Sequence, residues 1–137
     1  MSKLALLGLC LLLPGMAGAQ TQDNWSQDDT VQDDSARDAV ALGTGAMLRG
    51  VDKVSGYVTD IELANGGVGA FERLTVELGE CRHPSDDAAL DAYAFLTIRD
   101  TQSGEEFFSG WMLASSPALN AMEHPRYDIW VLRCKTE

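Results

Sequence analysis

A period of two in the apolar and polar positions dominates the chain from Ala46 onward, and this period predicts β-strands. In the segment 57–63, the residues of one face are apolar or small, whereas those of the other face are mostly charged. The first face carries Tyr57, Thr59, Ile61 and Leu63, and the second carries Val58, Asp60 and Glu62. The segment is therefore predicted to be a half-buried strand, which the turn sequence Asn65-Gly66-Gly67 ends.

A second strand region is predicted from Phe71 to Cys81, and a polar loop from Arg82 to Asp91. The apolar residues that alternate in this strand region are Leu74, Val76 and Leu78, with Thr75 and Glu77 on the opposite face. Such a pattern indicates one face turned to the core and one turned to solvent.

The segment 92–99 alternates in the same way, but both of its faces carry large or apolar side chains. One face has Ala92, Ala94, Leu96 and Ile98, and the other has Tyr93, Phe95, Thr97 and Arg99. Aromatic residues on the second face indicate that both sides are partly covered, as in the wall of a sandwich or barrel. A turn at 100–104 and a further strand at 105–114 are expected to follow.

The period changes after Ala114. Ser116 is the expected N-cap of a short helix that begins at Pro117 and includes residues 118–122. Pro125 stops this helix, since proline is not tolerated in a helix interior. Residues 128–134 then form the last predicted strand.

The N-terminus has the pattern of an export signal. Lys3 precedes an apolar run over 4–13, and Ala17-Gly18-Ala19 provides small residues for cleavage between Ala19 and Gln20. The apolar run is shorter than the roughly twenty residues that a membrane-spanning helix needs. We therefore expect residues 1–19 to be a signal peptide and the mature protein to be periplasmic, without stable membrane insertion.

Residues 20–45 are predicted to form an acidic, mostly disordered leader before a single β domain at 46–137. Six aspartates lie between residues 20 and 38, where apolar residues are few, so this segment cannot bury enough surface to offset its ordering entropy. The aspartate spacing lacks the glycine and closing glutamate of an EF-hand calcium loop. Trp25 is either incidental or a docking anchor for a partner.

Two cysteines remain after cleavage, Cys81 and Cys134. In an oxidising compartment such a pair predicts a structural disulfide, which the chain-entropy estimate values at about 4 kcal/mol for so long a loop. A redox or metal-binding role is disfavoured because no Cys-x-x-Cys sequence is present. The predicted fold class is mainly β: a compact antiparallel β-sandwich or barrel-like domain of six or seven strands, with one short helix and one disulfide.

The charge of the chain disfavours some partners. The formal net charge is −11, and the few lysines and arginines are scattered. A nucleic acid or an anionic membrane surface would need clustered cations, so neither is an expected partner.

Several motifs resemble one family. They are Leu48-Arg49-Gly50-Val51-Asp52-Lys53, Leu74-Thr75-Val76, Cys81-Arg82-His83-Pro84, Asp91-Ala92-Tyr93-Ala94, and the long stretch from Gly110-Trp111-Met112 to Cys134, which includes His124-Pro125-Arg126-Tyr127. From Ala46 to Cys134 the chain is similar to the alphaproteobacterial exported domain-of-unknown-function family 2155. The resemblance implies periplasmic residence, a shared β domain and a shared cysteine pair, and it implies no activity.

Residue types that carry chemistry are present, but their patterns are weak. Ser115 or Ser116 with His124 and Asp128 would supply a hydrolase nucleophile, base and orienting acid, yet no nucleophile elbow surrounds either serine. A zinc site from His83 and His124 would need a third protein ligand. The acidic residues are too numerous for any pair to indicate glycoside chemistry. We therefore expect no catalytic residues, no metal and no cofactor.

A binding surface is predicted on and beside the segment 115–127, because a polar loop is harder to explain by packing than a strand is. Its candidate residues are Trp111, Ser116, Asn120, His124, Arg126 and Tyr127. Trp111 and Trp130 are themselves expected to fill the core. Arg126 is expected to stack on an aromatic ring or to pair with Glu123 or Asp128.

The function predicted from these features is non-enzymatic: an interaction module, or an accessory or assembly factor, of the cell envelope with an envelope protein as partner. The alternative is a small β-barrel that binds an apolar or peptidic ligand in a cavity lined from the Tyr93, Phe95 and Trp111 regions. A minor hydrolase that uses Ser116 and His124 is the third hypothesis.

Overall fold

The computed structural model describes residues 39–137, which form eight strands and one 3₁₀ turn. The strands are β1 (Val40–Leu42), β2 (Gly45–Asp52), β3 (Val58–Ala64), β4 (Val68–Phe71), β5 (Leu74–Pro84), β6 (Tyr93–Asp100), β7 (Glu106–Leu113) and β8 (Tyr127–Lys135), and the turn is η1 (Pro117–Leu119). The predicted signal peptide, its cleavage site, residues 20–38 and Trp25 lie outside the described residues. The first sheet begins at Val40, so ordered strand structure starts before the domain boundary predicted at Ala46.

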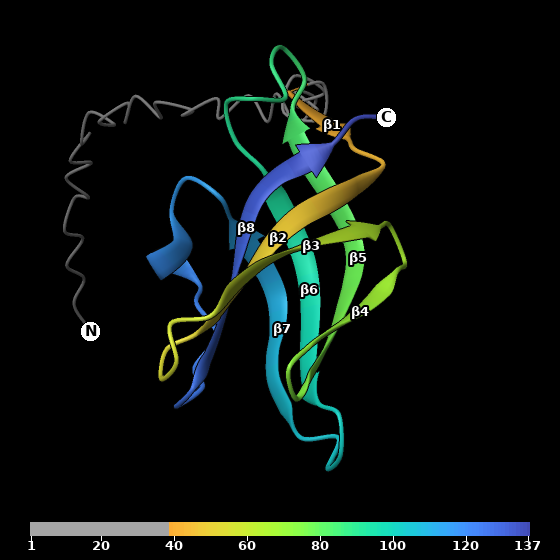
Figure 1. The fold of residues 1–137 in the computed structure, drawn as a ribbon. Coiled ribbons are helices and arrows are strands. Elements are labelled where there is room, and N and C mark those ends of the chain that lie inside the picture. The colour runs from red at the N-terminus through yellow and green to blue at the C-terminus, as the bar shows by residue number, and fades with distance from the viewer. Residues whose placement is uncertain (1–38) are drawn as a thin grey trace, which may run out of the picture. The chain divides into compact units, whose positions relative to one another are not determined.

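The strands form two antiparallel sheets that pack face to face (Figure 1). One sheet has the order β1-β5-β6-β7, with β4 also paired to β5, and the other has the order β3-β2-β8. Within residues 39–137 no ladder of hydrogen bonds joins the two sheets into a closed barrel. The prediction of a mainly β, antiparallel domain is confirmed, and its sandwich form is the one observed.

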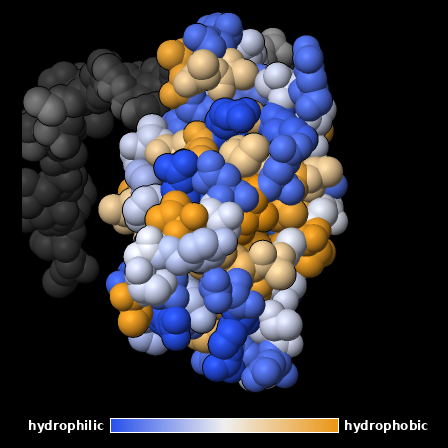
Figure 2. All heavy atoms as spheres, in the orientation of Figure 1, coloured by the Kyte–Doolittle hydropathy of each residue, from blue (hydrophilic) through white to orange (hydrophobic). Residues whose placement is uncertain are grey.

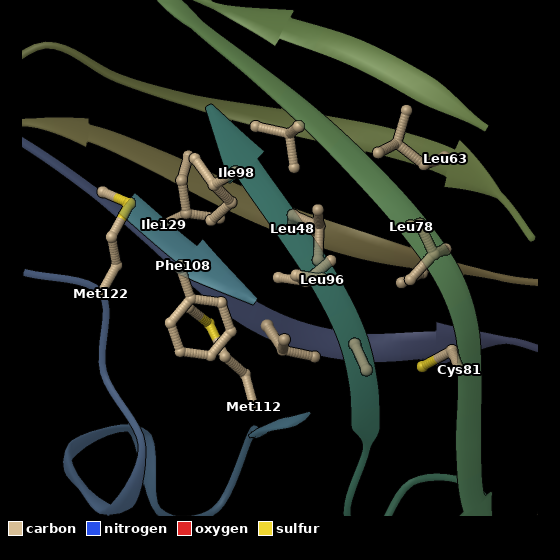
Figure 3. Close-up of a cluster of buried hydrophobic side chains, with 14 of the residues drawn as sticks. Leu48, Leu63, Leu78, Cys81, Leu96, Ile98, Phe108, Met112, Met122 and Ile129 are labelled. Carbon is tan, nitrogen blue, oxygen red and sulfur yellow. The ribbon is translucent and has the colours of Figure 1, made fainter. Parts of the chain in front are cut away.

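Aliphatic side chains from both sheets fill the space between them (Figure 3). Leu48 and Ile129 come from one sheet, and Leu78, Leu96 and Ile98 from the other; each is at most 1% exposed. Burying one such side chain stabilises the fold by about 1.5–3 kcal/mol. The predicted alternation in the segment 92–99 is confirmed, since its four inward residues are fully buried.

The predicted strand over residues 71–81 is wrong at both ends. The chain reverses at Glu72 and Arg73, where Phe71 pairs with Leu74 across a two-residue hairpin turn. Glu72 has a φ of 51°, a conformation that glycine or asparagine usually provides, so no ordinary turn residue marked the site. At its other end β5 continues to Pro84 instead of entering a loop, because β1 pairs with residues 82–84.

The disulfide between Cys81 and Cys134 is confirmed, and it links β5 of one sheet to β8 of the other. Asn65 supports the same corner of the sandwich. Its Nδ2 donates to the Gly43 carbonyl at 2.7 Å, and its Oδ1 accepts from the Cys81 amide at 3.2 Å. The turn at 65–67 therefore holds both the start of β2 and the cysteine strand in place.

Gly50 lets an aromatic ring lie directly on the backbone of β2. A Cβ at this position would come within 2.5 Å of the Phe71 ring. That ring stacks on Tyr57, with centroids 6.4 Å apart, and meets the edge of Tyr127 at 5.8 Å. The glycine is therefore required by a close approach that closes this end of the core.

Three predictions about the last third of the chain need correction. The helix over 118–122 is a single 3₁₀ turn, and Ser116 makes no side-chain capping hydrogen bond. Trp111 and Trp130 lie outside the core, 36% and 41% exposed, because alternation in β7 and β8 turns Met112 and Ile129 inward instead. Met122, from the loop after η1, completes the core on that side (Figure 3). Between residues 39 and 137 no helix is long and apolar enough to cross a membrane.

Candidate functional site

The six residues predicted to bind a partner fall into two separate groups in the fold. His124, Arg126 and Tyr127 surround the end of β2, whereas Trp111 and Asn120 lie at the edge of β7. Ser116, at the start of η1, makes no side-chain capping bond. The predicted set is therefore not one site.

The first group is organised by a carboxylate that sequence reasoning did not select. The Asp52 side chain is 3% exposed, and its Oδ2 accepts from Arg126 Nη2 at 2.8 Å and from Nε at 3.1 Å. Its Oδ1 accepts from the amides of Val54 and Ser55. The Arg126 guanidinium holds the pKa of the Asp52 carboxyl far below its usual range. Arg126 thus forms the expected ion pair, and it lies over the Tyr127 ring at 5.4 Å, but its partner is neither Glu123 nor Asp128.

His124 is held by backbone groups. Its Nδ1 accepts from the amides of Arg126 at 3.0 Å and Tyr127 at 2.9 Å, so the neutral ring carries its proton on Nε2. The ring stacks on Tyr127, with centroids 5.0 Å apart, and meets the edge of Phe107 at 4.5 Å. Burial, and then the nearby Lys53, lowers the pKa of His124.

Lys53 completes the connection between the turn after β2 and the loop before β8. Its Nζ donates to the His124 carbonyl at 2.6 Å, and its amide donates to the Arg126 carbonyl at 2.8 Å. A polar pocket of about 200 Å³ remains at this junction, lined by Arg73, Asp100, His124, Arg126 and Tyr127. Because the Asp52 carboxylate, His124 Nδ1 and Lys53 Nζ each have an internal partner, we interpret this cluster as a structural clamp.

Three of the side chains proposed for a hydrolase, Ser115, Asp128 and His124, are engaged in other contacts. Ser115 Oγ donates to Asp91 Oδ2 at 2.6 Å, and Asp128 Oδ2 accepts from the Trp130 indole at 2.8 Å. His124 Nδ1 has no proton to give to an orienting acid, since it accepts two amides. Residues 39–137 contain no cluster of three or more His, Cys, Asp or Glu side chains that could hold a metal ion.

The second group lies on the outer face of the five-stranded sheet. Strand register places Leu42, Arg82, Tyr93 and Leu113 in one row across β1, β5, β6 and β7, and Phe95 beside Trp111 in the next row. We call the set the outer aromatic surface: Val40, Leu42, Arg82, Tyr93, Phe95, Trp111 and Leu113. Sequence reasoning selected Trp111 and noted the aromatic residues of β6, but it missed Val40, Leu42, Arg82 and Leu113. Strand pairing brings them together: β1 with β5 for Val40 and Leu42, β5 with β6 for Arg82, and β6 with β7 for Leu113.

Contacts within this surface fix Trp111. Its ring meets Phe95 edge to face at 5.4 Å, and the Arg82 guanidinium lies 5.8 Å from its centroid. Asn120 Nδ2 donates to the Trp111 carbonyl at 2.9 Å. A groove of about 320 Å³ runs along the surface, lined by Val40, Arg82, Tyr93, Trp111 and Leu113. Arginine, tryptophan and tyrosine are the residues that most often dominate binding energy at interfaces.

The outer face of the other sheet has a mixed polar and apolar surface with ion pairs. On the side that carries β2, β3 and β8, hydrophilic and hydrophobic side chains are interspersed (Figure 2). Arg49 pairs with Asp60 at 2.8 Å, and Lys135 pairs with Glu62. A second groove of about 340 Å³, lined by Pro117, Ala118, Ala121, Asp128 and Trp130, lies beside η1. Trp130 is thus a second exposed tryptophan, but it lies on the other sheet and outside the outer aromatic surface.

These features define the class of this protein as a disulfide-linked antiparallel β-sandwich with an aromatic surface on one sheet. The family described as "Uncharacterized protein conserved in bacteria (DUF2155)" matches residues 46–134, and the chain belongs to this family. An uncharacterised protein of Rickettsia prowazekii (strain Madrid E) is 29% identical over 94 residues, which cover 66% of this chain. The matched region spans 61% of the length of that relative. No solved structure matches the chain.

Proposed function

We propose that this protein is a periplasmic, non-enzymatic interaction module, an accessory or assembly factor of the cell envelope that binds a protein partner through the outer aromatic surface. The observation that carries the proposal is the groove formed by Tyr93, Trp111 and Leu113 around Arg82 on a sheet face turned away from the core. Contiguous apolar surface of this kind is unfavourable in water and marks interaction sites on soluble domains.

Export is supported by two features. The sequence begins with the pattern of a secretory signal, and Cys81 is bonded to Cys134. Structural disulfides persist in oxidising compartments and are rare in the cytosol, where thiols are kept reduced. The periplasm is the compartment that fits both features.

The alternative function is the binding of a peptidic or apolar ligand. The 320 Å³ groove favours it, with the ligand site on the outer face of the sheet and not in a barrel cavity. A barrel cavity is not its site, since Leu48, Leu96 and Ile98 fill the space between the sheets. The ligand would instead lie on the outer face, along Tyr93 and Trp111. The two functions therefore share one surface, and they differ in whether the bound chain belongs to a stable partner.

Affinity capture tests the proposal. The tagged mature chain would be purified from envelopes of its own host solubilised in mild detergent, beside a Leu113→Asp variant and a form that lacks residues 20–38. Leu113 lies on the outer face, away from the core, so the Leu113→Asp variant should fold. The added charge in the groove should abolish binding. A stoichiometric partner that is recovered equally with Leu113→Asp would refute the surface. A partner lost on removal of residues 20–38 alone would assign binding to the leader.

A further inference from the structure

We infer that the partner binds the outer aromatic surface with a basic segment. An apolar or aromatic side chain of that segment enters the groove, and lysine or arginine side chains beside it face the carboxylates that border the groove. This inference rests on the proposed function and names the chemistry of the partner. The groove provides the apolar contact, and its border determines the charge of the bound segment.

Arg82 does not make the groove a site for a carboxylate. It is the cation among the residues that line the groove, but its Nε already donates to Glu80 Oε1 at 2.6 Å. Its guanidinium also lies 5.8 Å from the centroid of the Trp111 ring. An acidic ligand would have to compete with Glu80, so we assign Arg82 the role of holding Trp111.

The loop 85–92 places two carboxylates at the border of the groove. It joins the end of β5, which pairs with Val40, to Tyr93, and in Figure 1 it lies at the same end of the sheet as β1. Its aspartates, Asp86 and Asp87, are exposed, and neither forms an ion pair with another of the described residues. Their negative charge is therefore available to a cation of the partner.

A third carboxylate, that of Asp91, is fixed beside the groove. It accepts from the Ser115 hydroxyl at 2.6 Å and from the Ser115 amide at 3.0 Å. Ser115 lies two residues beyond Leu113, which lines the groove. These bonds hold Asp91 between the start of β6 and the end of β7 without neutralising its charge.

Negative charge is concentrated around the outer aromatic surface and not around the other sheet. Residues 20–38 contain six aspartates and one arginine, and they join the chain directly before Ala39, next to Val40 of the groove. The outer face of the other sheet, by contrast, balances three cations with three carboxylates: Arg49, Arg133 and Lys135 with Asp60, Glu62 and Asp128. Complementary charges select partners and increase the rate of association, so a basic segment fits the outer aromatic surface.

A displayed library of short random peptides is the probe. Selected on the mature chain at low salt, it should yield peptides in which an aromatic or apolar residue is flanked by lysine or arginine. Calorimetric titration with synthetic forms of these peptides should show a loss of at least about tenfold in affinity for Trp111→Ser. The affinity of the wild type should also fall severalfold as the ionic strength rises from about 0.01 to about 0.15 M, because salt screens exposed charges.

The double variant Asp86→Asn/Asp87→Asn tests the border of the groove. It should bind the peptides about fivefold more weakly than the wild type, since each exposed ion pair contributes little. Glu72→Gln/Glu105→Gln is the matched control, because it removes two exposed carboxylates from the turns at the opposite end of the same sheet, and it should bind like the wild type. Equal affinities of the two double variants, or selected peptides that are neutral or acidic, would overturn the inference while leaving the proposed function intact.

Selected peptides that bind Trp111→Ser as tightly as the wild type would contradict the outer aromatic surface itself, and with it the proposed function. A library that yields no peptides would overturn the inference but not the proposed function, which the captured partner tests.

Two further outcomes would replace the partner by another occupant of the groove. Deletion of residues 20–38 should weaken the binding of basic peptides, because it removes six aspartates. A gain in affinity on that deletion would instead identify the chain's own leader as the occupant. A dimer in sedimentation that Trp111→Ser dissociates would identify a second copy of the chain. Either result would overturn the inference.

Discussion

Arg126 donates hydrogen bonds from Nε and Nη2 to the Asp52 carboxylate, at distances of 2.8–3.2 Å. The two residues lie 74 positions apart in the chain. The carboxylate is buried and the guanidinium is half-exposed. The pair joins the end of β2 to the loop before β8, and Lys53 adds two hydrogen bonds to that loop. The segments Leu48–Lys53 and His124–Tyr127 are therefore held together by one cluster of hydrogen bonds, the structural clamp.

Removal of Arg126 should be costly, because it leaves a buried carboxylate without its partner. Arg126→Ala is expected to lower the melting temperature by roughly 5–10 °C. In the double variant Asp52→Asn/Arg126→Ala, the loss should be smaller than the sum of the two single losses. Arg49→Ala, which breaks the exposed pair with Asp60, is the matched control and should change the melting temperature little. Equal losses from Arg126→Ala and Arg49→Ala would refute the clamp.

His124 should make stability depend on pH. Its pKa in the folded chain lies below the ordinary value of about 6.5, so the unfolded chain binds the proton first. The free energy of unfolding should therefore decrease as the pH falls below about 6.5. His124→Asn keeps an acceptor for the two amides but does not titrate. Urea unfolding of both proteins between pH 7 and pH 5 should give a shallower slope for the variant; equal slopes would contradict the assignment.

Reduction of the Cys81–Cys134 bond should weaken the sandwich, since the bond connects its two sheets. The free energy of unfolding is expected to fall by about 2–5 kcal/mol. Urea unfolding with and without dithiothreitol measures the loss. A Cys81→Ser/Cys134→Ser double variant should match the reduced wild type and should not respond to the reductant. A wild type that is equally stable in both conditions would show that the bond does not hold the sheets together.

Gly50→Ala should destabilise the fold because its Cβ would come within 2.5 Å of the Phe71 ring. Overpacking of this kind costs about 1–3 kcal/mol. Phe71→Leu removes the ring that causes the clash, so the double variant should lose less than the sum of the two single variants. Chemical unfolding of the four proteins completes the cycle. Strict additivity would mean that the glycine is required for another reason.

The sequence predicted those parts of the fold that local alternation determines. Leu96 and Ile98 in β6 point inward as expected, since the period of two is a property of the strand itself. The reversal at Glu72 was missed because no glycine or asparagine marks it. Trp111 and Trp130 were assigned to the core by residue type, whereas the alternation of β7 and β8 places them outside.

The candidate site was predictable only in part, for a related reason. Trp111 could be selected as a large aromatic residue in a specific motif, and the second face of the segment 92–99 signalled Tyr93 and Phe95. Arg82 and Leu42 join them through strand pairings between segments that are distant in the sequence. Asp52 was likewise missed because its partner, Arg126, is brought to it by the pairing of β2 with β8.

The most direct test of the interaction surface compares two exposed tryptophans on different sheets. Trp111→Ser and Trp130→Ser remove side chains of the same type with similar exposure, 36% and 41%. Binding of each variant to the captured partner would be measured by titration calorimetry, after circular dichroism has established that both are folded. We predict a loss of at least about tenfold for Trp111→Ser and little change for Trp130→Ser. Equal affinities, or a loss confined to Trp130→Ser, would contradict the assignment of function to the outer aromatic surface.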